Sequence, residues 1–175
     1  MTTTPNLVTS QITIRPYRDR DWEEVCQVHD RAQPAEFAGS CDLKGMRPLS
    51  ENPYIARIFP LCRKFVACDG KKVIGIMAIY QGYIILLYID PDYQHQGIGC
   101  RLLRLAINLI GSPAWTIVMA GNQNAIRFYE KAGFVKVETF ENTVSGYPCT
   151  FIRMKRAYGE GSAAQDSPRT RPYPL

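Results

Sequence analysis

The chain has 175 residues, a length that suits one domain with a well-developed hydrophobic core. Apolar residues make up 46% and charged residues 21%, which excludes an intrinsically disordered chain and is typical of a globular protein. The net charge is +5, but the basic residues are scattered along the sequence. This pattern argues against nucleic acid as the partner and leaves an anionic cofactor as the better explanation.

Neither a membrane span nor a secretory leader is predicted. The longest purely apolar run, Tyr83 to Ile89, is far shorter than the roughly 20 residues that cross a bilayer. Residues 1–11 have no basic start and no long apolar stretch, so we expect a cytoplasmic protein. The six cysteines form no C-x-x-C pair, and His29 and His95 are the two histidines. We therefore expect mostly reduced, structural thiols without a disulfide framework, and no metal site.

Hydrophobic periodicity and turn residues divide the chain into elements. Alternating polarity predicts strands, an apolar residue every three or four positions predicts helices, and glycine and proline predict breaks. His29 lies on the apolar face of the first helix and is interpreted as a core or edge histidine rather than a catalytic one. In chain order the sequence predicts a strand over 11–16, a helix over 21–32, a loop over 33–52, a helix over 53–61, strands over 64–68, 73–80 and 83–90, a helix after 97, a strand over 115–119, a helix over 122–132, and strands over 134–140 and 148–154.

The order of these elements predicts the fold class. Asp69-Gly70 and Gln81-Gly82 join three strands by tight turns, which indicates an antiparallel meander. A meander that feeds a strand–helix–strand unit gives a single α/β domain with a mixed, mostly antiparallel sheet and helices on both faces. The domain is expected over 11–156. A flexible N-terminus over 1–10 and a flexible tail over 157–175, rich in Gly, Ser, Pro and Arg, are expected to flank it.

The segment with the most chemical information follows the third meander strand. The strand ends at Pro91, and a loop that contains Gly97 and Gly99 opens an amphipathic helix. Free backbone N–H groups and the helix dipole favour a phosphate at such a helix start. No Lys-Ser/Thr pair follows, which excludes a P-loop, and the third glycine of a dinucleotide fingerprint is absent. Taken alone, the two glycines could also form only a tight strand-to-helix turn.

Two blocks of the sequence resemble the GNAT family of acyltransferases. Gln94-x-x-Gly97-x-Gly99 resembles the family's Q/R-x-x-G-x-G/A signature. Further on, Asn122-x-x-Ala125-x-x-Phe128-Tyr129-Glu130-Lys131-x-Gly133-Phe134 resembles its N-x-x-A-x-x-F-Y-E-K-x-G-F segment. The blocks stand in the family's order with the expected strand between them, and the resemblance covers about residues 11–155.

This resemblance implies acetyl-CoA as co-substrate, no metal, and a GNAT-type sheet whose central strands splay apart. The amides from His95 to Arg101 would hold the pyrophosphate, and Asn122 and the backbone of the preceding strand would contact the pantetheine arm. Tyr129 would be the catalytic residue, protonating the departing thiolate, although a core aromatic is the alternative. The N–H of Ile89 could polarise the thioester carbonyl. The implied cofactor-binding residues are Leu87, Tyr88, Ile89, Gln94, His95, Gln96, Gly97, Ile98, Gly99, Cys100, Arg101 and Asn122.

The sequence leaves the general base and the acceptor open. Tyr83 and Ile117 occupy two positions at which members of the family carry a carboxylate. The base is therefore expected to be one of three loop carboxylates or a water molecule. The candidate bases are Glu36, Asp42 and Glu141, and the candidate acceptor residues are Phe37, Asp42, Arg47, Tyr54 and the segment 142–147.

The predicted function is an N-acetyltransferase that moves acetyl from acetyl-CoA to a primary amine by direct attack. A small-molecule amine is the favoured acceptor, a peptide or protein amine comes next, and a tRNA-linked aminoacyl group is last. The missing base keeps a second hypothesis open: a catalytically silent acyl-CoA-binding sensor or regulatory module. General nucleotide binding is a third. No membrane partner is expected, and the resemblance leaves room for a homodimer.

Overall fold

The computed structural model describes residues 11–157, so the predicted flexible segment 1–10 and all but the first residue of the predicted tail 157–175 lie outside the described residues. One seven-stranded sheet has the order β1-β2-β3-β4-β5-β7-β6. All neighbouring strands are antiparallel except β4 and β5, which are parallel. The elements are β1 (Ile12–Pro16), α1 (Trp22–Phe37), α2 (Pro53–Ile58), β2 (Arg63–Asp69), β3 (Lys72–Tyr80), β4 (Tyr83–Ile89), α3 (Ile98–Ile110), β5 (Ala114–Met119), α4 (Gln123–Lys131), β6 (Val135–Val144) and β7 (Tyr147–Arg156).

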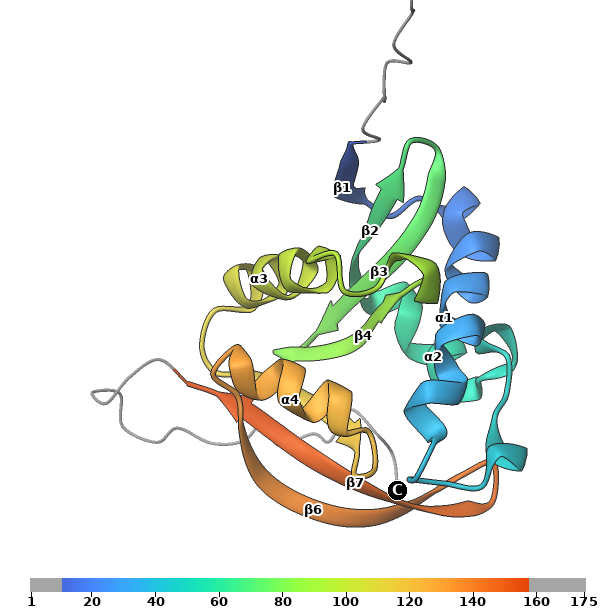
Figure 1. The fold of residues 1–175 in the computed structure, drawn as a ribbon, viewed down its shortest axis with the longest axis vertical. Helices are drawn as coiled ribbons and strands as arrows, with labels where there is room; N and C mark the ends of the chain where they lie inside the picture. The colour runs from blue at the N-terminus through green and yellow to red at the C-terminus, as the bar shows by residue number, and fades with distance from the viewer. Residues whose placement is uncertain (1–10, 158–175) are drawn as a thin grey trace, which may run out of the picture.

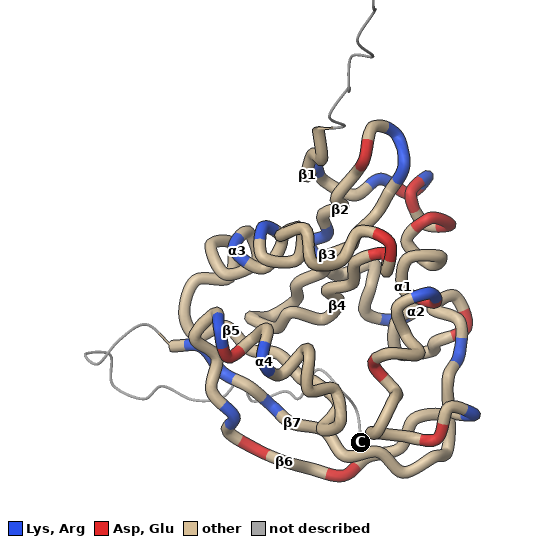
Figure 2. The backbone as a smooth tube through the Cα atoms, viewed as in Figure 1, with Lys and Arg blue, Asp and Glu red and all other residues tan. Residues whose placement is uncertain are grey.

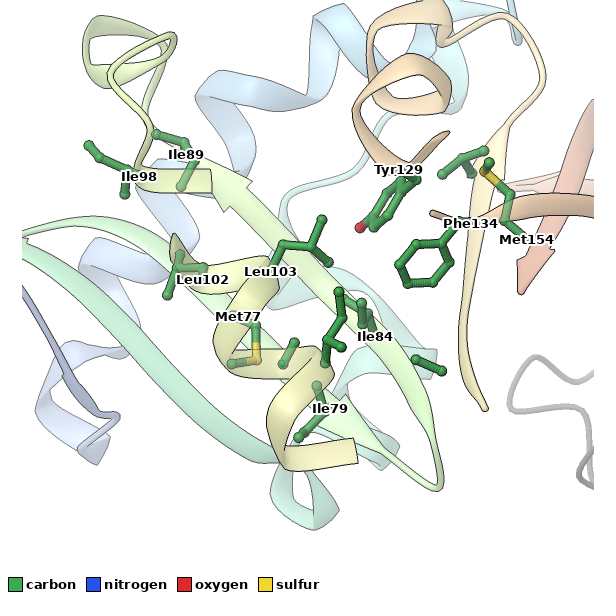
Figure 3. Close-up of a cluster of buried hydrophobic side chains, with 14 of the residues drawn as sticks. Met77, Ile79, Ile84, Ile89, Ile98, Leu102, Leu103, Tyr129, Phe134 and Met154 are labelled. Atoms are coloured by element: carbon green, nitrogen blue, oxygen red, sulfur yellow. The ribbon is translucent and has the colours of Figure 1, made fainter. Parts of the chain in front are cut away.

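Helices cover both faces of the sheet, as predicted. Figure 1 shows α3 and α4 together on one side and α1 and α2 on the other. Each side has its own hydrophobic core, and the sheet lies between them. Figure 3 shows the core under α3 and α4, where Leu102, Leu103, Tyr129 and Phe134 meet side chains of the sheet. Fully burying a side chain such as Leu102 stabilises the fold by about 2 kcal/mol, so the apolar stripe of α3 fixes this helix on the sheet.

The main difference from the predicted elements is the end of the first helix. The loop predicted over 33–52 is wrong for its first part, because α1 continues through Pro34 to Phe37. Proline lacks an N–H and normally breaks a helix. Here the additional turn buries Phe37, which is 2% exposed, and this burial offsets the lost hydrogen bond. The longer helix brings Glu36 over the sheet.

The central strands splay, as the resemblance implied. β4 and β5 pair at Tyr83↔Trp115 and Ile84↔Thr116 and then separate, because β4 stays on β3 while β5 stays on β7. The register between β3 and β4 also shifts next to Ile85, which therefore lies in a β-bulge. The result is a gap in the middle of the sheet, open between the two helical layers.

A disulfide joins Cys41 to Cys149, whose Cα atoms are 5.1 Å apart. The prediction of reduced thiols without a disulfide is wrong for this pair. The two cysteines are 108 residues apart in the sequence, and no local pattern indicates that the fold brings them together. Cys26, Cys62 and Cys68 are free thiols, and Cys100 is free and exposed.

The charges follow no single-sign face. Figure 2 shows basic and acidic residues interspersed along the chain, with Lys and Arg on the outer surfaces of α3 and α4. Among residues 11–157, no helix combines the length and apolar character needed to cross a membrane.

Candidate active site

The loop between β4 and α3 is the candidate anion cradle. Gly97 is the N-cap of α3 and has φ 78°, a left-handed conformation that favours glycine. The helix's own hydrogen bonds begin with the N–H of Arg101, which donates to the Gly97 carbonyl at 3.1 Å. The N–H groups of Ile98, Gly99 and Cys100 precede that bond and have no acceptor within the helix. They lie at the positive end of the helix dipole, where a phosphate is favoured.

Three residues predicted to contact the cofactor instead donate side-chain hydrogen bonds to backbone carbonyls of the protein. The side-chain amide of Gln94 donates to the Ile89 carbonyl at 3.1 Å, and that of Gln96 donates to the Asp92 carbonyl at 3.4 Å. Arg101 uses its amide within α3 and its guanidinium on the carbonyl of Ile12, at 3.1 Å. Gln94 and Gln96 therefore shape the loop, and the Arg101 amide is not one of the free donors.

An ion-pair network ties this loop to α1. Arg31 donates to a carboxylate oxygen of Asp90 at 2.6 Å and to one of Asp92 at 2.8 Å. Asp90 is buried, and its second oxygen accepts from the Asp92 amide at 3.0 Å. The position of α1 is thereby coupled to the position of the cradle.

The register of β4 decides which backbone groups face the gap. The amide of Asp90 donates to the Ile74 carbonyl on β3 at 2.9 Å. Hydrogen-bonding direction alternates along an antiparallel strand, so the backbone of Tyr88 also faces β3. Leu87 and Ile89 direct theirs into the gap. The prediction that the Tyr88 backbone pairs with the pantetheine is therefore wrong, while Leu87 and Ile89 have the orientation this role requires.

A cavity of about 460 Å³ runs from the cradle into the gap. Tyr129 of α4 lines it and is 6% exposed, with its ring against Phe128 and Phe134. Figure 3 shows its hydroxyl oxygen directed away from Phe134. Burial raises the pKa of Tyr129 to about 12, and the charge of Glu36 adds to this, although a hydrogen bond with Thr116 opposes it. The phenol is thus fully protonated at neutral pH and can donate a proton.

Asn122 lines the same cavity and also starts α4. Its side-chain oxygen accepts from the Ala125 amide at 3.1 Å, which is an N-cap. The side-chain oxygen is thus engaged in the cap, and the amide N–H donors are the groups that remain to contact a ligand.

A second cavity, of about 340 Å³, lies on the α1 side of the sheet. Phe37, Arg47, Tyr54 and the segment 142–145 line it, as predicted for an acceptor site. Gly45 and Phe151 add to its wall. Four residues line both cavities and therefore mark the junction between them: Glu36, Ile85, Tyr88 and Ile117.

Glu36 is the one carboxylate at this junction. It accepts a hydrogen bond from the hydroxyl of Tyr88 at 2.7 Å. Burial raises the pKa of Glu36 above its usual value, while the bond from Tyr88 opposes the rise. A carboxylate with a raised pKa is a stronger base at neutral pH than an exposed one.

The other two candidate bases lie elsewhere. Asp42 is exposed and accepts from the Lys44 amide at 2.9 Å, which caps the 3-10 turn Leu43–Gly45. Glu141 is exposed and accepts from the Thr150 hydroxyl at 2.7 Å. Neither residue lines the cofactor cavity or the acceptor cavity. Of the three predicted carboxylates, geometry favours Glu36.

Two side chains of the acceptor cavity were not predicted as functional. Tyr88 contributes its hydroxyl rather than its backbone. His29 is 5% exposed, as expected for a core histidine, but it lines the acceptor cavity and packs edge-on against Tyr88 at 4.7 Å. Its Nδ1 lies 2.8 Å from Asp30. A signal was present, since His29 and Glu36 share a helical face at i and i+7, but Pro34 concealed the continuity of the helix.

Within residues 11–157, no three His, Cys, Asp or Glu side chains are grouped as a metal site would need. The fold and the site have the features expected of an acyl-CoA-dependent transferase: a splayed sheet, a helix start with free N–H groups, and two cavities that meet at Glu36.

Comparison with known proteins agrees with this class. Residues 60–136 match the family model "Acetyltransferase (GNAT) domain". N-alpha-acetyltransferase 30 of Schizosaccharomyces pombe is 28% identical over 170 residues, 87% of this chain and 94% of that protein.

Two solved structures have the same fold. A GCN5-related N-acetyltransferase of Rhodopseudomonas palustris has a TM-score of 0.72 at 16% identity, covering 86% of this chain and 98% of its own. The PaiA N-acetyltransferase of Thermoplasma acidophilum, in complex with coenzyme A, has a TM-score of 0.63 at 21% identity, covering 85% and 99%. The chain is thus similar to GNAT-family N-acetyltransferases in sequence and shares their fold.

Proposed function

We propose that this enzyme transfers the acetyl group of acetyl-CoA directly to a primary amine, with Glu36 as general base and Tyr129 as general acid. The observation that carries the proposal is their arrangement. Glu36 lies where the two cavities meet, and Tyr129 lies in the cofactor cavity on the opposite side of the gap. Both residues line the cofactor cavity, Glu36 from α1 and Tyr129 from α4.

The cofactor cavity fits acetyl-CoA from the cradle to the gap. The N–H groups of Ile98, Gly99 and Cys100 bind the pyrophosphate. The Leu87 backbone faces the gap and pairs with the pantetheine amides, as a further strand would, while the Ile89 N–H faces the gap nearer the cradle. Asn122 contacts the same arm. A structural neighbour crystallised with coenzyme A supports this assignment.

The proposed reaction removes two protons from the ammonium nitrogen and gives one proton to the leaving sulfur. Glu36 takes a proton from the incoming ammonium group, which frees the lone pair of the nitrogen. The amine nitrogen then attacks the thioester carbonyl, and the N–H of Ile89 stabilises the negative charge that develops on its oxygen. As the carbon–sulfur bond breaks, Tyr129 gives its proton to the sulfur. The nitrogen, which still carries one proton too many, returns that proton to the Tyr129 phenolate, and Glu36 releases its proton to solvent.

A small amine with an apolar body is the acceptor that the second cavity favours. Phe37, Tyr54 and Phe151 offer aromatic surface, and Glu36 offers a negative charge to a cationic amine. Arg47 lies in the wall and can hold a carboxylate of the same substrate. A peptide N-terminus is the second candidate, favoured by the name of the S. pombe relative. Glu36 supplies the base whose apparent absence motivated the sensor hypothesis.

The test is transfer of label. The purified protein is incubated with isotopically labelled acetyl-CoA and a metabolite extract of the source organism, and labelled amides are identified by mass spectrometry. A labelled small amide supports the proposal and identifies the acceptor. Label on protein N-termini alone moves the acceptor class to peptides. Binding of acetyl-CoA without transfer to small molecules, proteins or RNA would leave the sensor hypothesis in its place.

A further inference from the structure

The disulfide joins the two walls of the acceptor cavity. Cys41 follows Glu36 by five residues, and its amide donates to the Phe37 carbonyl at 3.2 Å, which binds the loop to the last turn of α1. Cys149 lies on β7 opposite Asn142 of β6, which lines the same cavity. The bond therefore runs from the wall that carries Glu36 to the wall formed by the β6–β7 hairpin.

Close backbone contacts on either side of the disulfide seat the loop. Before it, the Ser40 hydroxyl oxygen accepts from the Gly121 amide at 2.9 Å. After it, Gly45 is buried so tightly that an added Cβ would lie 3.0 Å from the Val144 carbonyl. Figure 1 shows this loop reaching from the end of α1 to the β6–β7 hairpin. The two walls of the acceptor cavity keep this arrangement only while the loop after α1 stays in place. The disulfide is the covalent bond that holds the loop to the hairpin.

The two sulfur atoms differ in access. Cys41 is half-buried, whereas Cys149 is 2% exposed. An external thiolate can therefore approach Cys41 and displace Cys149 as the leaving thiolate. Three of the free thiols are shielded: burial raises the pKa of Cys26 and Cys62 to about 11 and also raises that of Cys68. A thiol with a raised pKa reacts slowly.

We propose that Cys41 and Cys149 form a reversible thiol–disulfide site through which low-molecular-weight thiols and disulfides set the affinity for the amine. Reduction consumes two thiols: the first forms a mixed disulfide with Cys41 and releases the Cys149 thiolate, which takes up a proton. The second thiol attacks the mixed disulfide, frees Cys41 and leaves as the oxidised small disulfide. Oxidation is the reverse exchange with that disulfide, so sulfur atoms, protons and electrons balance.

The bridged form is the one in which the acceptor cavity is pre-organised. Without the bond, the loop is held by non-covalent contacts such as those of Ser40 with Gly121 and of Gly45 with Val144. Ordering this loop at each binding event weakens amine binding, so the amine KM rises on the order of tenfold. The acetyl-CoA KM stays constant, because neither cysteine lines the cofactor cavity.

The test measures the oxidation state of Cys41 and Cys149 together with the order of the surrounding segments and the amine KM. The full chain is equilibrated at several ratios of reduced to oxidised glutathione, and alkylation with mass spectrometry locates the bonded cysteines. Hydrogen exchange follows segments 38–46 and 142–149 in the same samples, a readout that needs no acetyl transfer. The amine KM, measured with the acceptor found by label transfer, is the part that rests on the proposed function. Cys41→Ser removes the site at the half-buried position, and Cys149→Ala is the second variant. Cys26→Ala is the matched control.

The expected result is a bond between Cys41 and Cys149 at oxidising ratios, slower exchange in both segments, and a lower amine KM, all absent from Cys41→Ser and retained in Cys26→Ala. If the bond forms and exchange slows but no amine is acetylated, the modification site stands and the proposed function fails. A bond that forms at no ratio would overturn the inference. So would a bond that changes neither exchange nor the amine KM.

Discussion

Replacing Tyr129 by phenylalanine removes one hydroxyl group from the centre of the proposed mechanism. The ring stays, and with it the contacts to Phe128 and Phe134 in the core. Burial keeps the pKa of Tyr129 at about 12, so the wild-type phenol is protonated across the working pH range and the variant loses a donor under all these conditions. The substitution therefore tests proton donation with little change in shape.

The size of the effect follows from the role. General acid catalysis contributes about 10²- to 10⁴-fold to the rate of a reaction. We expect kcat to fall by about 100-fold or more, which corresponds to about 2.7 kcal/mol in the barrier. The hydrogen bond with Thr116 is also lost, which costs about 1 kcal/mol of stability. The acetyl-CoA KM should change less than about twofold, because the cradle and the edge of β4 are untouched.

The assay measures initial rates of coenzyme A release over a range of both substrates. Tyr80→Phe is the matched control, since Tyr80 ends β3 and lines neither cavity. A Tyr129→Phe enzyme that keeps its kcat within about twofold of the wild type would refute the donor role. A lower kcat together with a much weaker acetyl-CoA affinity would point instead to a packing role for the hydroxyl.

Three further predictions test the base, the cradle and the fold. Glu36→Gln should lower kcat by about 100-fold and abolish the acid limb of the pH–rate profile. Because burial raises the folded-state pKa of Glu36, its contribution to stability is lost as pH rises through that value, so the variant should melt at a higher temperature than wild type at pH 8. Gly97→Ala imposes a left-handed strain of about 1–2 kcal/mol on the cradle and should weaken acetyl-CoA binding in calorimetry, whereas Gly70→Ala, at φ 58° in the β2–β3 turn, should lose stability without losing affinity. Asp21→Asn should cost about 2 kcal/mol in urea unfolding at pH 7; Arg15 lowers the pKa of this buried carboxylate, so the difference should vanish as pH falls through that lowered value.

The features that the sequence predicted well have local causes. The helix start after Gly97, the apolar stripe of α3 and the two hairpin turns of the meander each depend on a few neighbouring residues. Each could therefore be identified from composition and spacing alone. The resemblance of two motifs added the splay and the position of Tyr129, which no local pattern contains.

The features that the sequence did not predict depend on pairing between distant segments. The direction of the Tyr88 backbone follows from the register of β4 on β3. The junction at Glu36 required α1 to continue past Pro34, which happened because Phe37 could be buried against the rest of the fold. The link from Cys41 to Cys149 required the loop and the hairpin to meet. Tertiary packing decided each of these outcomes. For α1 it overrode the local helix-breaking signal of Pro34, and for the other two no local signal existed.

The position of the two cavities also constrains the order of chemical events. The four residues that they share are Glu36, Ile85, Tyr88 and Ile117, so the junction offers a base and a phenol but no serine, cysteine or lysine. A covalent acetyl-enzyme needs a nucleophile at the point where the thioester arrives. The proposed mechanism uses no such intermediate: the acetyl group passes straight to the amine, so both substrates have to be bound at once. The splay makes this geometry possible, because the thioester can reach the gap from the α3–α4 side while the amine enters from the α1 side.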